Sequence, residues 1–453
     1  MLSSKVTKAL INIVGRDFFS DEKEDLLSYA YDATQEKKMP EAVVFPGSAE
    51  EISAIIKLAN KYHFPVIPRG AGTGMAGGAV PLKGGVVIVL SRLNRILKID
   101  EKNFYVWVEP GVVTGELQQA VAEKGLFYPP DPASLSFSTI GGNIATCAGG
   151  ARAVKYGVTR DYVLALEIVL PTGEIIHTGR KTIKGVSGYD ITSFFVGSEG
   201  TLGIFTKILL RLLPFPPAKG TILLNLEKLK VLPHLLMRLL HLPERLTAIE
   251  FMDDLCRECI KDKFPFDLPP GEGLLLLEVD GSEKVVNIML ESIITIANEL
   301  KVEVIKKEQK EKSELWEIRR AISPILFQLG EKKASYDIVV PYSHIFSMIK
   351  KIKMLRKEYK IHILCFGHIG DGNLHVNILY SSKEKNKAET VAKEIIKNTL
   401  NFGGTITGEH GIGYKKAAFL PWEIEPNTLH LMQRLKHTLD PNNILNPGKI
   451  FTI

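Results

Sequence analysis

The sequence predicts an α+β protein of two or three domains, and three observations lead to this prediction. The stretch that begins at Glu41 reads strand, turn, helix, strand, which is the start of a βαβ unit. A sharp break at Pro214, Pro216 and Pro217 is typical of a domain boundary. Beyond the break, apolar strand-like segments alternate with amphipathic helical segments, which indicates a sheet backed by helices.

The first half of the chain contains recognisable helix and strand signals in order. Ser48 and Glu51 have the spacing of a helix capping box, and the apolar face of the helix that follows consists of Ile52, Ile55, Ile56 and Ala59. Strands are expected at VVIVL, ILKID and YVWVEP, then a helix from Thr114 to Lys124 and a Gly-rich stretch over 129–150. LALEIVL-PTG-EIIHTG predicts a hairpin.

The second half reads as strands separated by helices. The expected strands are TILLNL, GLLLLEV, KVEVI and YDIVV. From about Leu420 we expect a helix followed by the turn-rich segment LDPNNILNPGK.

Composition and charge exclude several classes of protein. The 453 residues are 45% hydrophobic and 24% charged, which is a globular composition. The net charge of +6 is modest and the basic residues are interleaved with acidic ones, so no nucleic-acid partner is expected. Neither a signal peptide nor an apolar run of about 18 residues is evident, so we expect a cytoplasmic protein without an integral membrane segment.

The four cysteines are too few for a disulfide framework in a chain of this length. Cys256 and Cys259 form a C-x-x-C pair, but without a second pair they cannot close a four-thiolate metal site. Their spacing also fits one buried helix face, which is the interpretation that we favour.

A cluster of glycines directly follows one predicted strand, in the segment RGAGTGMAGG over 69–78. Successive glycines let backbone N–H groups converge on an anion such as a pyrophosphate. Gly72, Gly74 and Gly77 also satisfy the Rossmann spacing, which requires a helix to begin at once. The glycines and the proline over 77–85 prevent such a helix, and VVIVL is followed by Ser91 rather than by an acidic residue, so we reject the Rossmann interpretation.

Two further runs of small residues follow, PPDPASLSFSTIGGNIATCAGG over 129–150 and VGSEGTLGI over 196–204. Three such loops separated by strands favour an extended dinucleotide bound along backbone amides. With these motifs in this order, the sequence resembles the FAD-linked oxidases of the vanillyl-alcohol oxidase superfamily. The similar branch contains the glycolate oxidase D-subunit and D-lactate dehydrogenase, and the match runs from about Glu41 to the C-terminus.

This resemblance implies a domain organisation and a cofactor. Residues 1–215 would form an FAD-binding domain of two α/β subdomains, and 216–419 a substrate or cap domain with an antiparallel sheet, flanking helices and a metal site. Residues 420–453 would return to the FAD-binding domain. The residues implied for FAD are Arg69, Gly70, Ala71, Gly72, Thr73, Gly74, Met75, Gly78, Pro130, Asp131, Thr139, Gly141, Gly142, Ala145, Glu199, Ile204 and Asn446. Relatives with covalent flavin carry a histidine where this chain has Thr73, so we expect non-covalent FAD.

Two histidine motifs indicate a metal site. FGHIGDGNLHVN holds His368 and His375 around a Gly-Asp-Gly turn, and strand–turn–strand geometry brings such imidazoles together. TGEHGIG supplies Glu409 and His410. Two histidines and one carboxylate leave a coordination position open, as catalytic zinc requires, although iron(II) or manganese also accepts such a set.

The resemblance implies a role for each of these residues. His368, His375 and Glu409 would bind the metal, and His410 would act as the base. Asn377 would contact the substrate. A substrate carboxylate also needs a cation, for which SELWEIRRAISP offers Arg319 and Arg320, and the family pattern of tryptophan-x-x-arginine selects Arg319.

The predicted reaction is oxidation of a small D-2-hydroxy acid, with hydride passing to flavin N5. Relatives specific for D-2-hydroxyglutarate have a lysine where this chain has Ser335, so D-lactate or glycolate is favoured over D-2-hydroxyglutarate or another hydroxy acid. Two other classes stay open: a metallohydrolase with structural glycine loops, and a non-catalytic FAD-bearing electron-transfer subunit.

Electrons would pass to a separate acceptor, because the chain has no haem motif and no iron–sulfur cysteine cluster. An electron-transfer flavoprotein, an iron–sulfur subunit, a quinone or a cytochrome would each serve. The sequence leaves the oligomeric state open, with a homodimer as one option.

Overall fold

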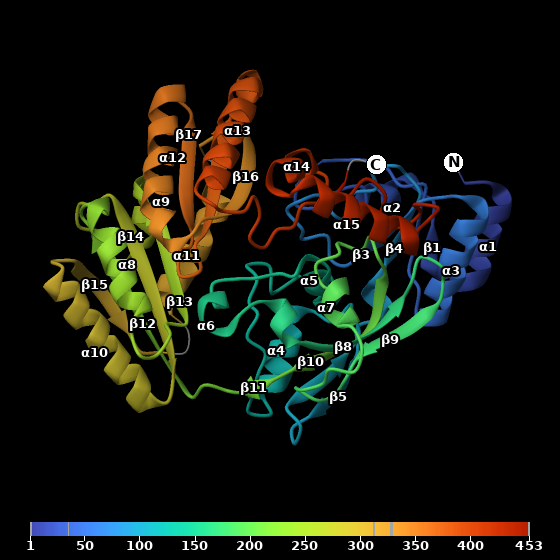
Figure 1. Ribbon diagram of the computed structural model, residues 1–453, viewed down its shortest axis with the longest axis horizontal. Helices are drawn as coiled ribbons and strands as arrows, with labels where there is room; N and C mark the ends of the chain where they lie inside the picture. Colours follow the sequence, from blue (N-terminus) through green and yellow to red (C-terminus); the bar gives the residue numbers. More distant parts are fainter. Residues whose placement is uncertain (1, 35, 311–312, 327–328, 452–453) are drawn as a thin grey trace. The chain divides into compact units, whose positions relative to one another are not determined.

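The computed structural model describes residues 2–34, 36–310, 313–326 and 329–451, and the chain divides into two compact units (Figure 1). Unit 1 comprises Met1–Ala148, Val158–Phe215 and Glu409–Ile453, and unit 2 comprises Gly149–Gly157 and Pro216–Gly408. Helices and antiparallel sheets occur in both units, which confirms the predicted α+β class. The domain boundaries expected after 215 and 419 stay predictions, and the compact units change after Phe215 and after Gly408.

The first sheet of unit 1 has four strands in the order β1-β2-β4-β3, with β2 and β3 parallel to β4. The elements of this part are α1 (Ser4–Val14), β1 (Phe19–Ser20), α2 (Lys23–Ser28), β2 (Ala42–Val44), α3 (Ala49–Tyr62), β3 (Val66–Arg69) and β4 (Val86–Val89). The expected βαβ start is confirmed as β2, α3 and β3. Ser48 caps α3 by accepting a hydrogen bond from the Glu51 N–H, whereas the Glu51 carboxylate accepts from Gly47.

The second sheet of unit 1 is antiparallel, in the order β5-β6-β10-β8-β9. Its strands are β5 (Ile96–Asp100), β6 (Tyr105–Val108), β8 (Val163–Val169), β9 (Ile175–Gly179) and β10 (Ile204–Arg211), and a small pair is formed by β7 (Leu126–Phe127) and β11 (Leu213–Pro214). The helices are α4 (Thr114–Ala122), α5 (Ile140–Thr146), α7 (Ile191–Phe195), α14 (Leu420–Glu423) and α15 (Pro426–Leu439). The predicted hairpin is confirmed as β8–β9.

Helix α5 lies within the Gly-rich stretch 129–150, where the sequence suggested an irregular loop. Thr139 caps this helix by accepting a hydrogen bond from the Gly142 N–H, and Ile140 and Ile144 are fully buried. A good N-cap and two core residues outweigh the low helix propensity of the adjacent Gly141 and Gly142.

Unit 2 is built on a seven-stranded antiparallel sheet in the order β15-β12-β14-β13-β17-β18-β16. The strands are β12 (Ala218–Leu226), β13 (Ala248–Asp253), β14 (Gly273–Gly281), β15 (Glu303–Glu308), β16 (Lys332–Val339), β17 (His362–His368) and β18 (Asn373–Tyr380). The helices are α6 (Ala153–Tyr156), α8 (Leu232–Leu240), α9 (Asp254–Ile260), α10 (Glu283–Glu299), α11 (Glu314–Ile325), α12 (Ile345–Tyr359) and α13 (Lys385–Asn401). Among the described residues, no helix is long and apolar enough to cross a membrane.

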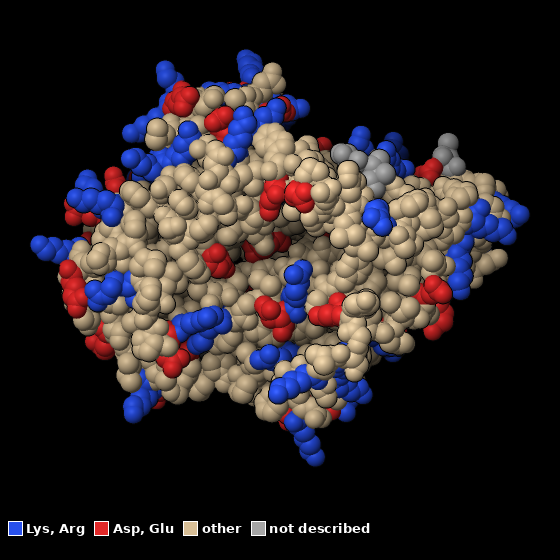
Figure 2. Space-filling model, viewed as in Figure 1, with Lys and Arg blue, Asp and Glu red and all other residues tan. Residues whose placement is uncertain are grey.

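Helices cover both faces of this sheet, which explains why its central strands are continuously apolar. Residues Leu274 to Leu277 of β14 are all buried. Helices α9 and α11 pack on one face through Cys256, Ile318 and Ile322. Helices α10, α12 and α13 also contact strands of this sheet. Figure 2 shows basic and acidic side chains interspersed over the face in view, in line with the interleaved charges of the sequence.

A buried lysine ties the C-terminal segment to unit 1. The ammonium of Lys436, on α15, donates to the carbonyl oxygens of Thr201 and Leu445, each at 2.8 Å, and pairs with Asp440 at 2.5 Å. Asp440 in turn accepts the N–H groups of Ile444 and Leu445. Burial lowers the pKa of Lys436, opposed by the Asp440 carboxylate. The last helix and the segment after it are therefore held by one satisfied polar cluster.

We expect Lys436→Met to destabilise the protein by about 3–5 kcal/mol, because removing the ammonium leaves the buried Asp440 carboxylate without its counter-charge and two carbonyl groups without their donor. The measurement is urea unfolding followed by intrinsic fluorescence. Lys415→Met is the control: Lys415 pairs with Glu36 at the surface, so its loss should cost about 1 kcal/mol or less. Equal effects of the two substitutions would contradict the structural role of Lys436.

Candidate active site

The hairpin of β17 and β18 places the two predicted histidines close together. Its register sets Phe366 opposite His375, and residues 369–372 connect the strands. Gly372 has a φ of +86°, and a Cβ there would lie 2.3 Å from the Val340 carbonyl oxygen, so only glycine fits this turn. The turn therefore fixes where His368 ends β17 and where His375 enters β18.

The imidazole rings of His368 and His375 face each other through their Nε2 atoms. The two Nε2 atoms are 3.2 Å apart, and the rings are perpendicular with centroids 4.9 Å apart. One ligand atom from each of His368, His375 and Glu409 lies within 4.8 Å of the other two. Ligands of tetrahedral zinc at about 2.0–2.1 Å are separated by roughly 3.4 Å, a value that the 3.2 Å between the two Nε2 atoms approaches.

Glu250, on β13, is a buried carboxylate that the sequence analysis missed. It pairs with His368 across β13 and β17, its Oε1 lies 2.5 Å from His368 Nδ1, and its Oε2 accepts from Arg319 Nη2 at 2.6 Å. Burial alone would raise its pKa, but the charges of His368 and Arg319 hold the pKa at about 2. The carboxylate is therefore ionised and shared between two predicted site residues.

Arg319 is held on the same face of the sheet by helix α11. It is only 8% exposed, and its guanidinium lies 4.6 Å from the centre of the Phe366 ring. Its Nε atom is buried and has no hydrogen-bond partner among the described residues. The guanidinium is thus oriented by Glu250 and Phe366 while one donor stays available.

Asn377 follows His375 on the same face of β18, as period-2 alternation predicts. Its Oδ1 accepts a hydrogen bond from the Ser335 hydroxyl, and its buried Nδ2 has no partner among the described residues. Nearby on β16, the fully buried carboxylate of Asp337 accepts hydrogen bonds from the Thr407 hydroxyl and the Gly408 N–H. Asp337 therefore fixes the backbone that leads directly into Glu409.

The loop that carries Glu409 and His410 continues into unit 1, where it is fastened by Glu199. Glu409 Oε1 lies 3.8 Å from His410 Nε2. Both oxygens of the Glu199 carboxylate accept backbone N–H groups at 2.7 Å, one from Ile412 and one from Gly413. Burial raises the pKa of Glu199, and these two N–H groups oppose that rise. Glu199 is one of the residues that the resemblance implies for FAD, and in this structure both oxygens of its side chain hold the loop after His410.

The glycine loop over 69–78 contains positions that reject any side chain. Gly72 and Gly77 have φ values of +73° and +81°. A Cβ at Gly72 would meet the Arg69 guanidinium, and one at Gly77 would meet the ring of Tyr414. This loop is therefore built so that backbone N–H groups can approach a ligand closely.

The side chain of Arg69 packs against this loop at Gly72. Its guanidinium donates to the Tyr31 carbonyl oxygen at 2.7 Å and lies 5.4 Å from the centre of the Tyr29 ring. Burial lowers its pKa, with the Asp32 carboxylate opposing. Arg69 therefore stabilises the conformation of the loop.

Asn446 joins two of the predicted loops. Its Nδ2 donates to the Gly78 carbonyl oxygen at 3.0 Å and to the Glu199 carbonyl oxygen at 2.8 Å. Gly70 lies against Thr139, the cap of α5, so the second predicted loop adjoins the first. Unit 1 contains all of the residues expected to hold the dinucleotide, and the remaining ones are Ala71, Thr73, Gly74, Met75, Pro130, Asp131, Gly141, Gly142, Ala145 and Ile204.

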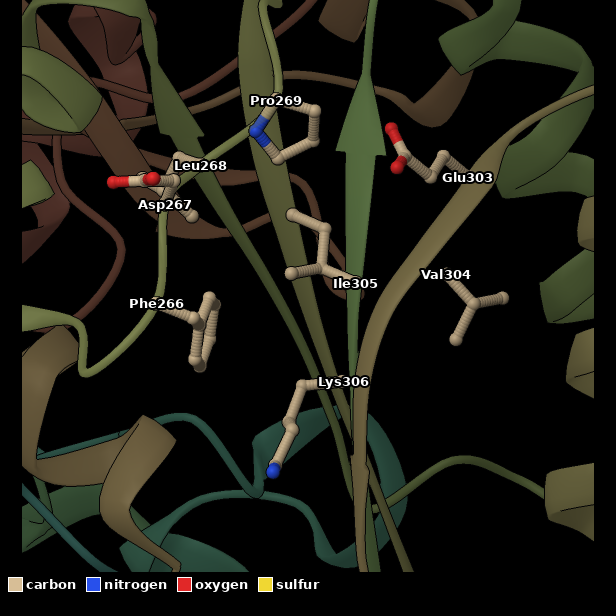
Figure 3. Close-up of a pocket in the computed structure, with 8 residues that line it drawn as sticks. All are labelled: Phe266, Asp267, Leu268, Pro269, Glu303, Val304, Ile305 and Lys306. Carbon is tan, nitrogen blue, oxygen red and sulfur yellow. The ribbon is translucent and has the colours of Figure 1, made fainter.

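A pocket of 440 Å³ lies elsewhere, at the edge of the unit 2 sheet (Figure 3). It is formed by the 266–269 segment and by β15, the edge strand. None of the candidate site residues lines it, so we assign it no part in the chemistry. The C-x-x-C pair is also structural: Cys256 is fully buried in α9, and burial raises the pKa of both thiols.

Comparisons with known proteins agree with the interpretation of the glycine loops as part of an FAD-binding domain. The family model for the FAD binding domain matches residues 40–179, and that for FAD linked oxidases, C-terminal domain, matches 216–450. The chain is 41% identical to the glycolate oxidase subunit GlcD of Bacillus subtilis strain 168, over all of this chain and 97% of that protein. It is 38% identical to a D-lactate dehydrogenase of Anaerostipes hadrus, over 91% of this chain and 90% of the relative.

A solved structure of p-cresol methylhydroxylase with substrate bound shares the fold. Its TM-score is 0.82 at 18% identity, and the match covers 98% of this chain and 96% of that one.

The role of Glu199 in holding the loop can be tested by hydrogen exchange. In Glu199→Ala, the amides of Ile412 and Gly413 should exchange at least about tenfold faster, since a hydrogen bond to a charged group contributes about 1.5–3 kcal/mol. Mass spectrometry of a peptide that covers 409–414 provides the measurement. Glu36→Ala, which removes an exposed carboxylate paired with Lys415, is the control and should leave these amides unchanged. Unchanged exchange in Glu199→Ala would show that the loop is held by other contacts.

Proposed function

Because the chain belongs to the family of FAD-linked oxidases, we propose that it oxidises a small D-2-hydroxy acid to the 2-oxo acid, with a divalent metal as a second cofactor. D-Lactate and glycolate are the favoured substrates, since the relatives named above include a D-lactate dehydrogenase and a glycolate oxidase subunit. The observation that carries the proposal is the facing pair of imidazoles beside a buried arginine. Membership of an oxidoreductase family removes the metallohydrolase alternative.

The residues of unit 1 suit an extended dinucleotide. A backbone cradle for a pyrophosphate requires residues with positive φ and no Cβ. Gly72 and Gly77 have positive φ angles, and neither position has space for a Cβ. In this proposal the residues that hold FAD are the seventeen that the sequence resemblance implied. Thr73 offers no nucleophile of the kind that binds flavin covalently, so the FAD is dissociable.

In the proposed site His368, His375 and Glu409 hold the metal, most simply zinc, with manganese and iron(II) as alternatives. When bound, FAD supplies a two-electron acceptor and the metal supplies a Lewis acid that lowers the pKa of the substrate hydroxyl. The protein residues do the rest: they bind, orient and deprotonate the substrate.

Arg319 and Asn377 orient the substrate. The buried Arg319 Nε and Asn377 Nδ2 are hydrogen-bond donors without a protein partner among the described residues, and a carboxylate accepts such donors well. His410 takes the proton from the substrate hydroxyl, a role that suits a side chain whose ordinary pKa is near neutral. Fixing the acid at its carboxylate leaves the C2–H bond in one orientation.

A second cation on the same face favours a second candidate, D-2-hydroxyglutarate. Lys333 lies two residues before Ser335 on β16, so the two side chains share a face of the sheet. Its Nζ lies 3.3 Å from the Ser323 hydroxyl, and burial lowers its pKa. Such a lysine could meet the distal carboxylate of a dicarboxylic acid.

The reduced enzyme needs a separate electron acceptor: an electron-transfer flavoprotein, an iron–sulfur subunit, a quinone or a cytochrome. All four cysteines are free, and Cys256 and Cys365 are buried, so the described residues show no set of four accessible thiols for an iron–sulfur cluster. A homodimer is part of the same proposal.

Anaerobic titration with single substrates tests the reaction. The purified protein should show a flavin band near about 450 nm that bleaches with D-lactate or glycolate and not with L-lactate. Bleaching by D-2-hydroxyglutarate at a clearly higher specificity constant would favour the second candidate and Lys333. A flavin band that none of these acids bleaches would contradict the proposed substrates and support a non-catalytic electron-transfer subunit.

Metal removal tests the histidine site. EDTA treatment should abolish bleaching by the substrate, and zinc or manganese should restore it, because two imidazoles and a carboxylate are the donor set. His375→Ala should lose the metal and the activity while keeping FAD. His362→Ala, at the exposed start of the same hairpin, is the control and should behave as wild type. Full activity of a metal-free preparation would exclude the metal from the mechanism.

A further inference from the structure

Glu250 connects the two halves of the proposed site in unit 2. Its side chain is completely buried at the centre of the sheet, and its two oxygens point to different partners. One oxygen meets His368, a proposed metal ligand, and the other meets Arg319, the proposed substrate cation. A buried carboxylate with the apolar side chains of Met252 and Leu276 beside it on the same face is costly unless both oxygens are satisfied.

We propose that Glu250 is a positioning residue that directs His368 to the metal and Arg319 to the substrate carboxylate. The inference rests on the proposed function for the identity of the metal and the substrate. The positioning itself rests on contacts within unit 2 alone.

The His368 contact determines which nitrogen is available to a metal. His368 Nδ1 and Glu250 Oε1 are 2.5 Å apart, and in a hydrogen bond between a ring nitrogen and a carboxylate oxygen the ring N–H is the donor, so we assign the hydrogen to Nδ1. In the neutral ring this leaves the lone pair on Nε2, the atom that faces His375 Nε2 at 3.2 Å. A carboxylate behind a metal-binding imidazole fixes the orientation of the ring and increases its basicity.

The Arg319 contact determines where the guanidinium points. Glu250 binds one terminal nitrogen, and the ring of Phe366 lies against the group. A guanidinium that is held at one end and has its charge balanced costs less to keep buried. The side chain of Arg319 is then held in one rotamer, and its buried Nε points in one direction.

The alternative is that Glu250 only provides a structural ion pair for Arg319. Both roles predict a loss of stability when Glu250 is changed, so stability does not distinguish them. Metal affinity and the histidine tautomer do, because a structural ion pair has no influence on either.

The test compares Glu250→Gln with Glu278→Gln in the FAD-loaded enzyme. Glu278 is the matched control: it is buried on the same face, on the adjacent strand β14, and it accepts a hydrogen bond from Trp316 of α11 at 2.6 Å. Zinc affinity is measured by competition with a chelating dye, and FAD content by absorbance. Glu250→Gln should weaken zinc binding about 10- to 100-fold with FAD retained, and raise KM for D-lactate more than it lowers kcat at saturating zinc. Glu278→Gln should keep wild-type zinc affinity.

Wild-type zinc affinity in Glu250→Gln, or the same loss in both variants, would overturn the proposal. A measurement on the unmodified protein covers the case in which Glu250→Gln does not fold. In the metal-free wild type, histidine ¹⁵N spectra, assigned with His368→Gln, should show His368 protonated at Nδ1 and unprotonated at Nε2. A ring protonated at Nε2 alone would equally reject the assignment.

These outcomes separate the inference from the proposed function. If the wild type bound no divalent metal, the proposed metal role would fail, whereas the His368 tautomer would still report on Glu250. If the wild type bound zinc and Glu250→Gln bound it equally well, the proposed function would stand and the positioning role would fail.

Discussion

The antiparallel pairing of β17 with β18 is the constraint on which the rest of the proposed site depends. The turn closes because Gly372 adopts a positive φ and has no Cβ, for which the Val340 carbonyl oxygen leaves no room. That turn sets the register, and the register sets Phe366 opposite His375. A slip of one residue would send His375 and Asn377 to the opposite face of the sheet, away from Glu250 and Arg319.

The second consequence of this pairing is a polar layer inside an apolar sheet. His368 ends β17 where β13 contributes Glu250, and Asp337 on β16 is the cross-strand partner of His375. Each buried carboxylate has its own partners: Glu250 binds a guanidinium and an imidazole, and Asp337 binds a hydroxyl and a backbone N–H. Isolated buried charges would cost several kcal/mol each, so the layer is stable only as a connected set.

The sequence predicted the parts of this site that are close along the chain. The Gly-Asp-Gly turn between His368 and His375 indicated the hairpin, and alternation placed Asn377 with His375. Glu250 was not predictable because it is 118 residues from His368 and lies in AIEFMD, which reads as an ordinary buried strand. The only signal was a single acidic residue in the middle of that apolar strand. Glu199 illustrates the same limit, since its 2.7 Å contacts are with backbone groups more than 200 residues away.

The charges of the proposed site favour a substrate with one negative charge. The charge of Arg319 is already balanced by Glu250, so this pair orients the substrate carboxylate but adds no net charge to the site. A divalent ion with neutral His368 and His375 and an ionised Glu409 has a net charge of about +1, which one carboxylate neutralises. A dicarboxylic acid would bring a second negative charge into a buried layer, and this is stable only with another cation. On this face of the sheet Lys333, two positions along β16 from Ser335, could supply that cation, so this half-buried lysine is the residue that would favour a glutarate-type over a lactate-type substrate.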